Sequence, residues 1–461
     1  MPTIKVVNIT PKALSGDRLL DSEPNLAVNP ENPDQMVATA FTPDPMGGPL
    51  APVYVSADGG NTWVLNSVVP GNGSLGTGDI SIGFGSRGGR LYTGILNGRT
   101  GDMQILRAPN IASPTPMGVL VDRTDEDQPW VVAVSVTADG HSNDRVYVGS
   151  NDFASPANTA TVDVSGDAGT GPAPAGFAPV RLDRRSGVVF DGPPVRIAAH
   201  PDGTVYIVFM SITAEAPLDR ARKTFDVVVT RDDKGGVGPS PFEDLLDSAD
   251  GEVGQRAVSG RKVRFNPQQR TLGQERTGAD LSIAVDPTDS NSVWVAYCDN
   301  LGGAVPTDYV LHTLHSADRG QTWSTARPDV VNGKNPSFAV NSDGLVGLVY
   351  QQLTHNQWST VLELSDDGFR TVESQVLHQA PGDVPPAGNQ LPYLGDYIRM
   401  VTVGKDFYGI FAGNNTPDRA NFPVGVTYQR NANFTTRQLL STDGVTRIAP
   451  SIDPFFFHRA A

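Results

Sequence analysis

The sequence predicts an all-β fold, a single β-propeller of about seven four-stranded blades, with six blades as the alternative count. Glycine and proline are abundant, at 49 and 37 of the 461 residues, which indicates many turns. Charged residues make up only 18% of the chain, and short runs of Val, Ile, Tyr and Phe recur between clusters of Gly, Pro, Asn and Asp. One pattern of paired strands returns seven times along the chain, which indicates a radial repeat.

Each copy of the repeat consists of a polar residue in a turn, an apolar strand that often ends in Asn-Pro or Asp-Pro, and a second apolar strand. The copies occupy residues 23–41, 79–95, 128–149, 195–209, 280–297, 335–350 and 396–411. They place the blade starts of one domain, 1–461, near residues 23, 78, 127, 194, 280, 335 and 395. Third strands are predicted at 53–55, 104–106, 225–229, 310–314, 360–364 and 424–428.

The small size of the predicted sheets indicates that they close into a ring. A four-stranded blade cannot bury both of its faces alone, so each blade must pack against the next around a common axis. Two long steps between copies predict long loop insertions at 154–178 and 233–278. The second insertion is bipolar, with acidic residues from Glu243 to Glu252 followed by basic residues from Arg256 to Arg276. It is interpreted either as a solvated loop that partly neutralises itself or as a lid or partner-binding arm over one face of the propeller.

Composition excludes several classes of function. The formal net charge of −15 would repel a nucleic-acid backbone or an anionic membrane surface, so we expect no nucleic-acid partner. Cys298 is the single cysteine, which excludes an intramolecular disulfide and a cysteine-based zinc site. The start of the sequence lacks the apolar core of a signal peptide, and no apolar run approaches the ~20 residues of a membrane span. We therefore expect a soluble protein without membrane insertion, either cytoplasmic or a mature secreted form, and the sequence leaves its oligomeric state open.

A second motif, Ser-x-Asp-x-Gly-x-x-Trp, falls between the third and fourth strands of some blades. It is complete in two places, at Ser56, Asp58, Gly60 and Trp63 and at Ser316, Asp318, Gly320 and Trp323. Its chemistry is that of a tight hairpin turn, because the Asp carboxylate accepts backbone N–H groups, the Gly supplies positive φ and the Trp packs on the strands. Degenerate copies lie at 165–169, which lacks the Trp, and at 365–369, where Phe369 replaces the second Gly.

This motif resembles the Asp box of the sialidase-like superfamily of propellers, which is built from the bacterial neuraminidase (BNR) repeat, as do the strand starts at 24–30 and 394–397. The resemblance covers most of residues 23–430 and implies a carbohydrate-active protein whose Asp boxes are structural turns on the outer rim, remote from the active site. Asp58 and Asp318 are then structural residues. Sialidases of this superfamily have six blades and carry their first arginine in a Phe/Tyr-Arg-Ile-Pro motif. This sequence lacks that motif, so hydrolysis of sialic acid is not expected.

The start of each innermost strand is repeatedly polar. Because the innermost strands line the central channel, the following residues are predicted to converge on one rim: Glu23, Asp79, Asp127, Asp280, Asn335 and Asp396. Convergence raises carboxyl pKa values through mutual repulsion, so this rim would supply a general acid and a base for glycosidic cleavage. The catalytic candidates are Asp396, Tyr397, Asp280, Glu23 and Asp127, and the candidates for holding a ligand are Arg196, Arg399 and Asp79. The alternative is that these polar residues cap turns and that the arginines are buried ion-pair partners.

These observations predict an enzyme of the glycoside hydrolase or lyase type that acts on a glycan at the channel mouth. Such chemistry requires no cofactor, although the same carboxylates also suit a hard cation such as Ca²⁺. The histidines, among them His312 and His315, are expected to be structural, since no metal-ligand spacing emerges. The competing interpretation is a non-catalytic propeller scaffold that binds a glycan or a protein ligand, with the 233–278 segment as its contact arm.

Overall fold

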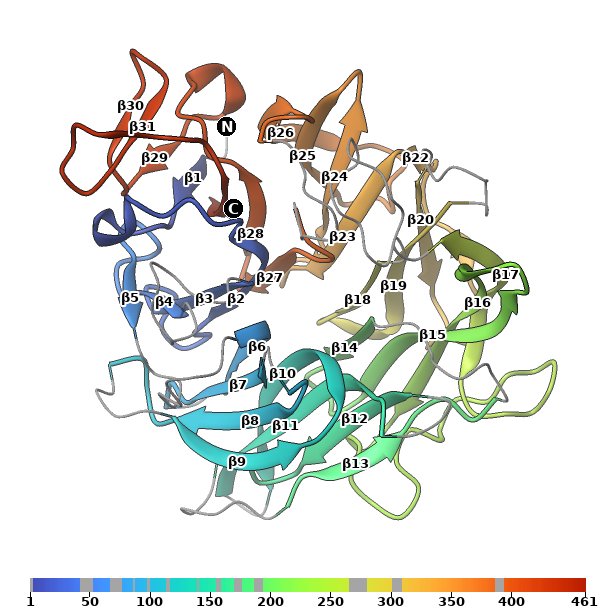
Figure 1. Cartoon of the computed structure of the whole chain (residues 1–461). Coiled ribbons are helices and arrows are strands. Elements are labelled where there is room, and N and C mark those ends of the chain that lie inside the picture. The colour runs from blue at the N-terminus through green and yellow to red at the C-terminus, as the bar shows by residue number, and fades with distance from the viewer. Residues whose placement is uncertain are drawn as a thin grey trace.

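The computed structural model describes residues 3–41, 53–66, 77–85, 88–97, 100–112, 117–138, 141–154, 159–169, 176–185, 194–264, 280–300, 309–385 and 394–461. Within these ranges the chain is built almost entirely of strands, and seven sheets are arranged as blades around a central axis (Figure 1). The described residues include two short 3-10 helices, η1 (Lys12–Leu14) and η3 (Arg419–Asn421). No helix in the described ranges is long and apolar enough to cross a bilayer. The prediction of an all-β propeller of about seven blades is confirmed.

The first four blades follow one another along the chain, with the strands of each in sequence order from the axis to the rim. Blade 1 contains β2 (Ser22–Val28), β3 (Met36–Phe41), β4 (Val53–Ser56) and β5 (Val64–Asn66). Blade 2 contains β6 (Thr77–Phe84), β7 (Leu91–Asn97), β8 (Met103–Ala108) and β9 (Gly118–Arg123). Blade 3 contains β10 (Glu126–Ala138), β11 (His141–Asp152), β12 (Ala160–Ser165) and β13 (Ala178–Arg181). Blade 4 contains β14 (Val195–Ala199), β15 (Val205–Ala216), β16 (Asp219–Asp232) and β17 (Gln255–Arg264).

Blades 5 and 6 repeat the same order of strands. Blade 5 contains β18 (Leu281–Asp286), β19 (Asp289–Asp299), β20 (Val310–Ser316) and β21 (Ser324–Thr325), and β22 (Val330–Val331) also pairs with β20. Blade 6 contains β23 (Gly333–Val340), β24 (Val346–Thr354), β25 (Gln357–Ser365) and β26 (Glu373–Pro381). The innermost strand of each blade contacts that of the next, and β27 (Arg399–Val403) of blade 7 contacts β2 of blade 1, which completes the ring (Figure 1).

Blade 7 closes the ring with strands from both ends of the chain. Strands β27 and β28 (Asp406–Asn414) are followed by β33 (Ile452–Arg459), and β1 (Ile4–Asn8) pairs antiparallel with β33 as the fourth strand. The third strand predicted at 424–428 is therefore wrong, because only the short β29 (Thr427–Tyr428) lies there, at the outer edge of β1. Residues Phe455 to Phe457 are fully buried, and burying these three rings removes more apolar surface from water than burying residues 424–428 would. Strands β30 (Ala432–Asn433), β31 (Gln438–Leu440) and β32 (Arg447–Ile448) form a small separate sheet.

The two predicted insertions also contain blade strands, so the interpretation of both as loops is wrong. Segment 154–178 contributes β12, the third strand of blade 3, and segment 233–278 contributes β17, the outermost strand of blade 4. In the turn before β17, Phe242 and Leu245 are buried and Asp247 pairs with Arg256 at 2.7 Å, so this part partly neutralises itself as predicted. Arg270 and Arg276 lie outside the described residues. The described part is integrated into blade 4 and does not form a separate arm.

The complete Asp boxes form turns between the third and fourth strands of blades 1 and 5. In blade 1 the Ser56 hydroxyl donates to the Asp58 carboxylate and accepts the N–H of Gly60, both at 2.9 Å, while Asp58 accepts the N–H and the hydroxyl of Thr62. The same bonds recur at 316–322 in blade 5 and at 365–371 in blade 6. In blade 6, Phe369 takes the glycine position with a φ of +65°. The turn therefore persists without its glycine and tryptophan where the serine, aspartate and threonine remain.

A substitution at the first of these turns separates backbone strain from packing. Gly60 has a φ of +78°, and a Cβ atom there would lie 2.3 Å from Cε1 of the buried Phe456. We expect Gly60→Ala to lower the free energy of unfolding by about 2–4 kcal/mol, because strain and a steric clash add. Gly101→Ala is the matched control, since Gly101 has a φ of +73° but no atom within 4 Å. The control should lose only the about 1–2 kcal/mol of backbone strain, and equal losses in urea denaturation would contradict the packing of Phe456 on this turn.

Candidate functional site

One equivalent position in each innermost strand, here called the tie position, holds a side chain that lies between neighbouring blades. In four blades it holds Asn or Ser, and the side-chain oxygen accepts the backbone N–H of the following innermost strand. The pairs are Asn25 with Ile82 at 3.3 Å, Ser81 with Val131 at 2.8 Å, Ser282 with Phe338 at 2.8 Å and Ser337 with Met400 at 2.9 Å. These bonds fix the register between blades and satisfy the buried N–H groups.

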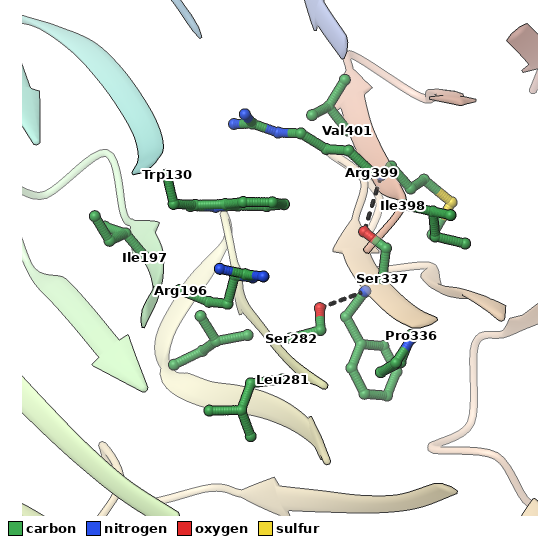
Figure 2. A pocket seen from close by; sticks show the side chains of 13 residues that line it. Trp130, Arg196, Ile197, Leu281, Ser282, Pro336, Ser337, Ile398, Arg399 and Val401 are labelled. Carbon is green, nitrogen blue, oxygen red and sulfur yellow. Dashed lines mark hydrogen bonds between the residues drawn. The ribbon is translucent and has the colours of Figure 1, made fainter. Parts of the chain in front are cut away.

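The tie positions of blades 3, 4 and 7 hold large side chains instead, namely Trp130, Arg196 and Arg399. Figure 2 shows the Trp130 ring between the two guanidinium groups, whose carbons lie 4.2 Å (Arg196) and 4.8 Å (Arg399) from the ring centroid. Together with Ser282 and Ser337, these side chains line a cavity of about 110 Å³. Burial lowers the pKa of Arg196 to about 10 and that of Arg399 to about 9, so both remain charged at neutral pH. The cavity is therefore cationic.

A ring of polar residues, here called the channel ring, lies two residues before the tie positions. Its members are at most 5% exposed: Glu23, Asp79, Gln128, Asp280, Asn335 and Tyr397. In three of them, Glu23, Gln128 and Asn335, the backbone has a φ of +49° to +51°, and strand pairing is interrupted there by a bulge. A bulge re-aims a side chain, and positive φ in a residue other than glycine costs about 1–2 kcal/mol. Such strain gathers at functional sites.

The structure differs from the prediction at two positions of the ring, Asp127 and Asp396. Gln128, and not Asp127, belongs to the channel ring, because its side-chain amide contacts the Asp396 carboxylate at 3.4 Å and the Arg196 guanidinium at 3.3 Å. The half-buried Asp127 accepts the N–H of Gln128 at 3.0 Å, which is the turn-capping role given as the alternative. In blade 3 the bulge moves the inward-facing residue by one place, which alternation in the sequence does not reveal. In blade 7, Tyr397 holds the ring position and Asp396 precedes it, after Gly395 with a φ of +89°.

Glycine brings Asp396 close to Glu23. Gly395 has a φ of +89°, and a Cβ atom there would lie 2.3 Å from Cγ of Glu23. Without that atom the backbone N–H of Asp396 donates to the Glu23 carboxylate at 3.2 Å. The Leu-Gly-Asp-Tyr sequence at 394–397 therefore positions the polar groups of blade 7 against those of blade 1.

Oppositely charged groups with shifted pKa values share this cluster. Burial raises the pKa of Asp280, and the charge of Asp396 adds to the effect, although the N–H of Asn335 at 2.8 Å and the charge of Arg196 oppose it. Lys334, which precedes the ring residue of blade 6, is 1% exposed. Burial lowers the pKa of Lys334 to about 7, against the charges of Asp396 and Glu23. Asp280 thus retains its proton at pH values where an exposed aspartate has lost it.

The polar groups of Tyr397 and Arg399 both form hydrogen bonds to other blades. The Tyr397 hydroxyl donates to Asp79 at 2.9 Å, and burial holds the pKa of this phenol well above its usual range. Arg399 donates to Asn25 at 2.7 Å and to the carbonyls of Ile82 and Val131 at 2.9 and 3.0 Å. Arg399 therefore bonds blade 7 to blades 1, 2 and 3 and supports Trp130.

Of the two arginines that line the cavity, Arg196 has more guanidinium N–H groups available for a ligand. It makes two bonds of 3.3 Å, to the Val195 carbonyl and the Gln128 amide oxygen, so N–H groups of its fork remain for a ligand (Figure 2). Within the described residues, no group of three or more His, Cys, Asp or Glu side chains is placed to hold a metal ion.

Three residues of the cluster were not among those predicted from the sequence: Trp130, Gln128 and Lys334. A signal for Trp130 exists, because the residue after the proline is Asn25 in blade 1 and Ser337 in blade 6 but tryptophan in blade 3. A large side chain where other repeats carry a small polar one marks a break in the inter-blade bonding. No comparable signal exists for Lys334, whose burial depends on the bulge beside it.

No protein-family model and no curated protein matches the chain. Solved structures with a similar fold include an ulvan lyase of polysaccharide lyase family PL25, at a TM-score of 0.49 and 10% identity over 85% of this chain and 91% of that one. They also include an α-L-arabinanase from Penicillium chrysogenum, at 0.45 and 14% over 76% and 94%, and the endosialidase of phage phi92, at 0.44 and 11% over 99% and 69%. A further one is the microbial sialidase Hz136, at 0.34 and 14% over 85% and 63%.

Proposed function

We propose that the chain is a carbohydrate-active enzyme that cleaves a glycosidic bond at the mouth of the propeller channel, with Asp280 as general acid and Asp396 as the partner carboxylate. One observation carries this proposal: two buried carboxyl groups, Asp280 and Asp396, lie in one cluster, where burial and the charge of Asp396 raise the pKa of Asp280. Asp280 precedes β18 and Asp396 precedes β27, and the charge of Asp396 acts on Asp280. Glycosidic cleavage uses such a pair, in which one carboxyl protonates the leaving oxygen and the other activates water or attacks the sugar.

The neighbouring groups have supporting roles in this proposal. Gln128 contacts the Asp396 carboxylate at 3.4 Å and orients it, while Glu23 accepts the backbone N–H of Asp396 at 3.2 Å. Glu23 and Gln128 are therefore positioning residues. Arg196 offers N–H groups toward the cavity, and its guanidinium lies 5.5 Å from the ring centroid of Tyr397, whose hydroxyl donates to Asp79. These three would bind sugar hydroxyl or carboxylate groups.

The buried lysine supports a second candidate function, cleavage of a uronate-containing glycan by β-elimination. With a pKa of about 7, Lys334 has a neutral amine fraction that can remove the proton beside the uronate carboxylate. The electron pair of that C–H bond forms the new C=C bond as the glycosidic C–O bond breaks, and the leaving oxygen takes the proton of Asp280. Arg196 would neutralise the uronate carboxylate.

The products of a polysaccharide panel test both candidates. Neutral and uronate-containing polysaccharides are incubated with the protein, and the products are analysed by mass spectrometry. Hydrolysis adds one water to the cleaved bond, whereas elimination gives an unsaturated uronate that absorbs in the ultraviolet. Asp396→Asn is expected to lower the rate of hydrolysis about 10²–10⁴-fold. Lys334→Met should abolish elimination and leave hydrolysis in place.

Asp144→Asn is the matched control for Asp396→Asn. Asp144 is also a buried carboxyl, which accepts the hydroxyls of Tyr92 at 2.8 Å and Ser135 at 2.6 Å. It lies in β11 opposite Ser135, seven residues beyond the ring residue Gln128 along β10, so it does not belong to the channel ring. This variant should retain turnover. A folded protein that releases no product from any member of the panel, or an Asp396→Asn variant as active as Asp144→Asn, would contradict the proposal and favour a non-catalytic scaffold.

A further inference from the structure

A second cavity, here called the flank cavity, lies between the outermost strand of blade 4 and the outer part of blade 5. Its volume is about 440 Å³, and its walls come from β17, β19, β20 and the residues that follow the Asp box of blade 5. It shares no lining residue with the cavity in the channel. A volume of this size matches the concave sites that hold small ligands.

The tryptophan of the blade 5 Asp box lines the flank cavity, although the same tryptophan in blade 1 is covered. Both indole N–H groups donate to the glycine carbonyl of their own turn, Trp63 to Gly60 at 3.2 Å and Trp323 to Gly320 at 3.0 Å. Trp63 is 2% exposed and packs against Phe456 of blade 7, with ring centroids 5.4 Å apart. Trp323 is only partly buried, because the neighbouring blade presents Leu245 near the turn in place of an aromatic ring. Folding therefore does not use the whole ring of Trp323.

The polar groups of the flank cavity neutralise one another. His312 lies between two carboxylates, with Asp299 at 3.2 Å from Nε2 and Asp329 at 2.8 Å from Nδ1. Burial lowers the pKa of His312, but the two carboxylates outweigh burial and leave that pKa raised. Asp299 also lies 3.5 Å from the Arg261 guanidinium, and Arg327 pairs with Glu363. Each cation has an acidic partner, so a ligand needs no net charge of its own.

Two further features point to a ligand with hydroxyl groups and an apolar face. Tyr297 is 1% exposed, because it stacks on the His312 ring at 4.6 Å between centroids and the Arg261 guanidinium lies over it, so it holds these two polar side chains in place at the cavity. Arg261 and Asp329 also line the cavity, and their side chains are 31% and 48% exposed, so their polar groups can reach a ligand.

We infer that the flank cavity is a second glycan-binding site, which holds one or two rings of a neutral sugar chain against Trp323. The C–H face of the sugar packs on the indole ring, while its hydroxyl groups bond with Arg261 and Asp329. A uronate carboxylate is disfavoured, because the arginines already face Asp299 and Glu363. The site would retain a polymer on the flank of the propeller, and it does not depend on catalysis in the channel.

Titration of the Asp280→Asn protein with neutral oligosaccharides tests this inference without turnover. Cello-, xylo- and arabino-oligosaccharides are the probes, oligogalacturonate is the charged comparison, and binding is followed by tryptophan fluorescence and calorimetry. Trp323→Leu should weaken binding of the neutral probe about five- to tenfold, the size expected for one lost aromatic contact. Trp63→Leu is the matched control: it changes the same residue of the same motif, should lose more stability, and should keep the affinity.

Arg261→Ala provides a second variant in case the tryptophan variants fold poorly. It leaves the Asp box intact and is also expected to weaken binding. Failure of every neutral probe to bind, preference for oligogalacturonate, or equal losses in Trp323→Leu and Trp63→Leu would overturn the flank site. Turnover of short soluble substrates should be unchanged by Trp323→Leu in the otherwise native chain. A protein that binds neutral oligosaccharides through Trp323 but cleaves none supports this site and contradicts only the proposed catalysis.

Discussion

Asp280→Asn is expected to lower the turnover of the cleaved glycan by about 10²–10⁴-fold while the protein remains folded. The amide has the shape of the carboxyl group and still accepts the N–H of Asn335, which lies 2.8 Å from the native carboxylate. It cannot deliver a proton to the leaving oxygen. Initial rates at saturating substrate measure the loss, with circular dichroism and thermal unfolding as controls. Full activity in a folded Asp280→Asn protein would show that another group protonates the leaving oxygen.

The pH dependence of the same reaction identifies the acid. Because Asp280 acts in its protonated form, kcat/KM should fall as the pH rises through its raised pKa. Asp396→Asn removes the negative charge beside Asp280 and therefore lowers the pKa of Asp280. The high-pH limb of the profile, where kcat/KM falls, should then move to lower pH in the residual activity of this variant. An unmoved limb would mean that Asp396 does not act on the proton-donating group.

Arg430→Met is expected to lower the free energy of unfolding by about 3–5 kcal/mol, because it leaves a buried carboxylate without its cation. Arg430 donates two bonds of 2.8 Å to Asp453 in β33, and it bonds the carbonyls of Ser15 and Asp17 at 2.9 and 2.8 Å. Both charged side chains are fully buried. These bonds attach the N-terminal segment to the last blade, where the ring closes. Urea denaturation measures the loss.

Arg437→Met is the matched control for ring closure. Arg437 pairs with Asp418 at 3.1 Å, but its side chain is 66% exposed, so the expected loss is about 0–1 kcal/mol. The double variant Arg430→Met with Asp453→Leu should recover only part of the stability, since it removes both buried charges together but leaves the buried amides of Asn8 and Asn415 without the carboxylate acceptor. A loss in Arg430→Met no larger than in the control would contradict the role of this ion pair in closure.

The paired strands were predictable because their signals are local. Runs such as 281–286 and 293–297 are apolar, and turn residues separate them, so alternation and turn chemistry indicate them directly. Ring closure depends on β1 and β33, which pair across almost the whole chain, and no local pattern indicates that pairing. Strand β12 also lacks a signal, since its sequence, Ala-Thr-Val-Asp-Val-Ser, is short and lies in a stretch rich in Gly and Pro.

The sequence predicts that polar residues gather at the start of the innermost strands, but it does not predict which of two adjacent residues faces the channel. Residues at the start of the innermost strand of a propeller face the channel, and this rule points to Glu23, Asp79 and Asp280 without structural information. Bulges with positive φ then decide which of two adjacent residues points inward, as Gln128 does beside Asp127. The bulge is a tertiary compromise between strand pairing and inter-blade contacts, so the sequence of one blade does not specify it.

A crystal structure of Asp280→Asn with an oligosaccharide that the native protein cleaves tests the central claim most directly. The account predicts a sugar bound at the channel mouth, with a glycosidic oxygen against the side chain of residue 280 and a hydroxyl or carboxylate group on Arg196. A saturated complex that holds sugar only in the flank cavity, with the channel cluster free of ligand, would contradict cleavage at this site.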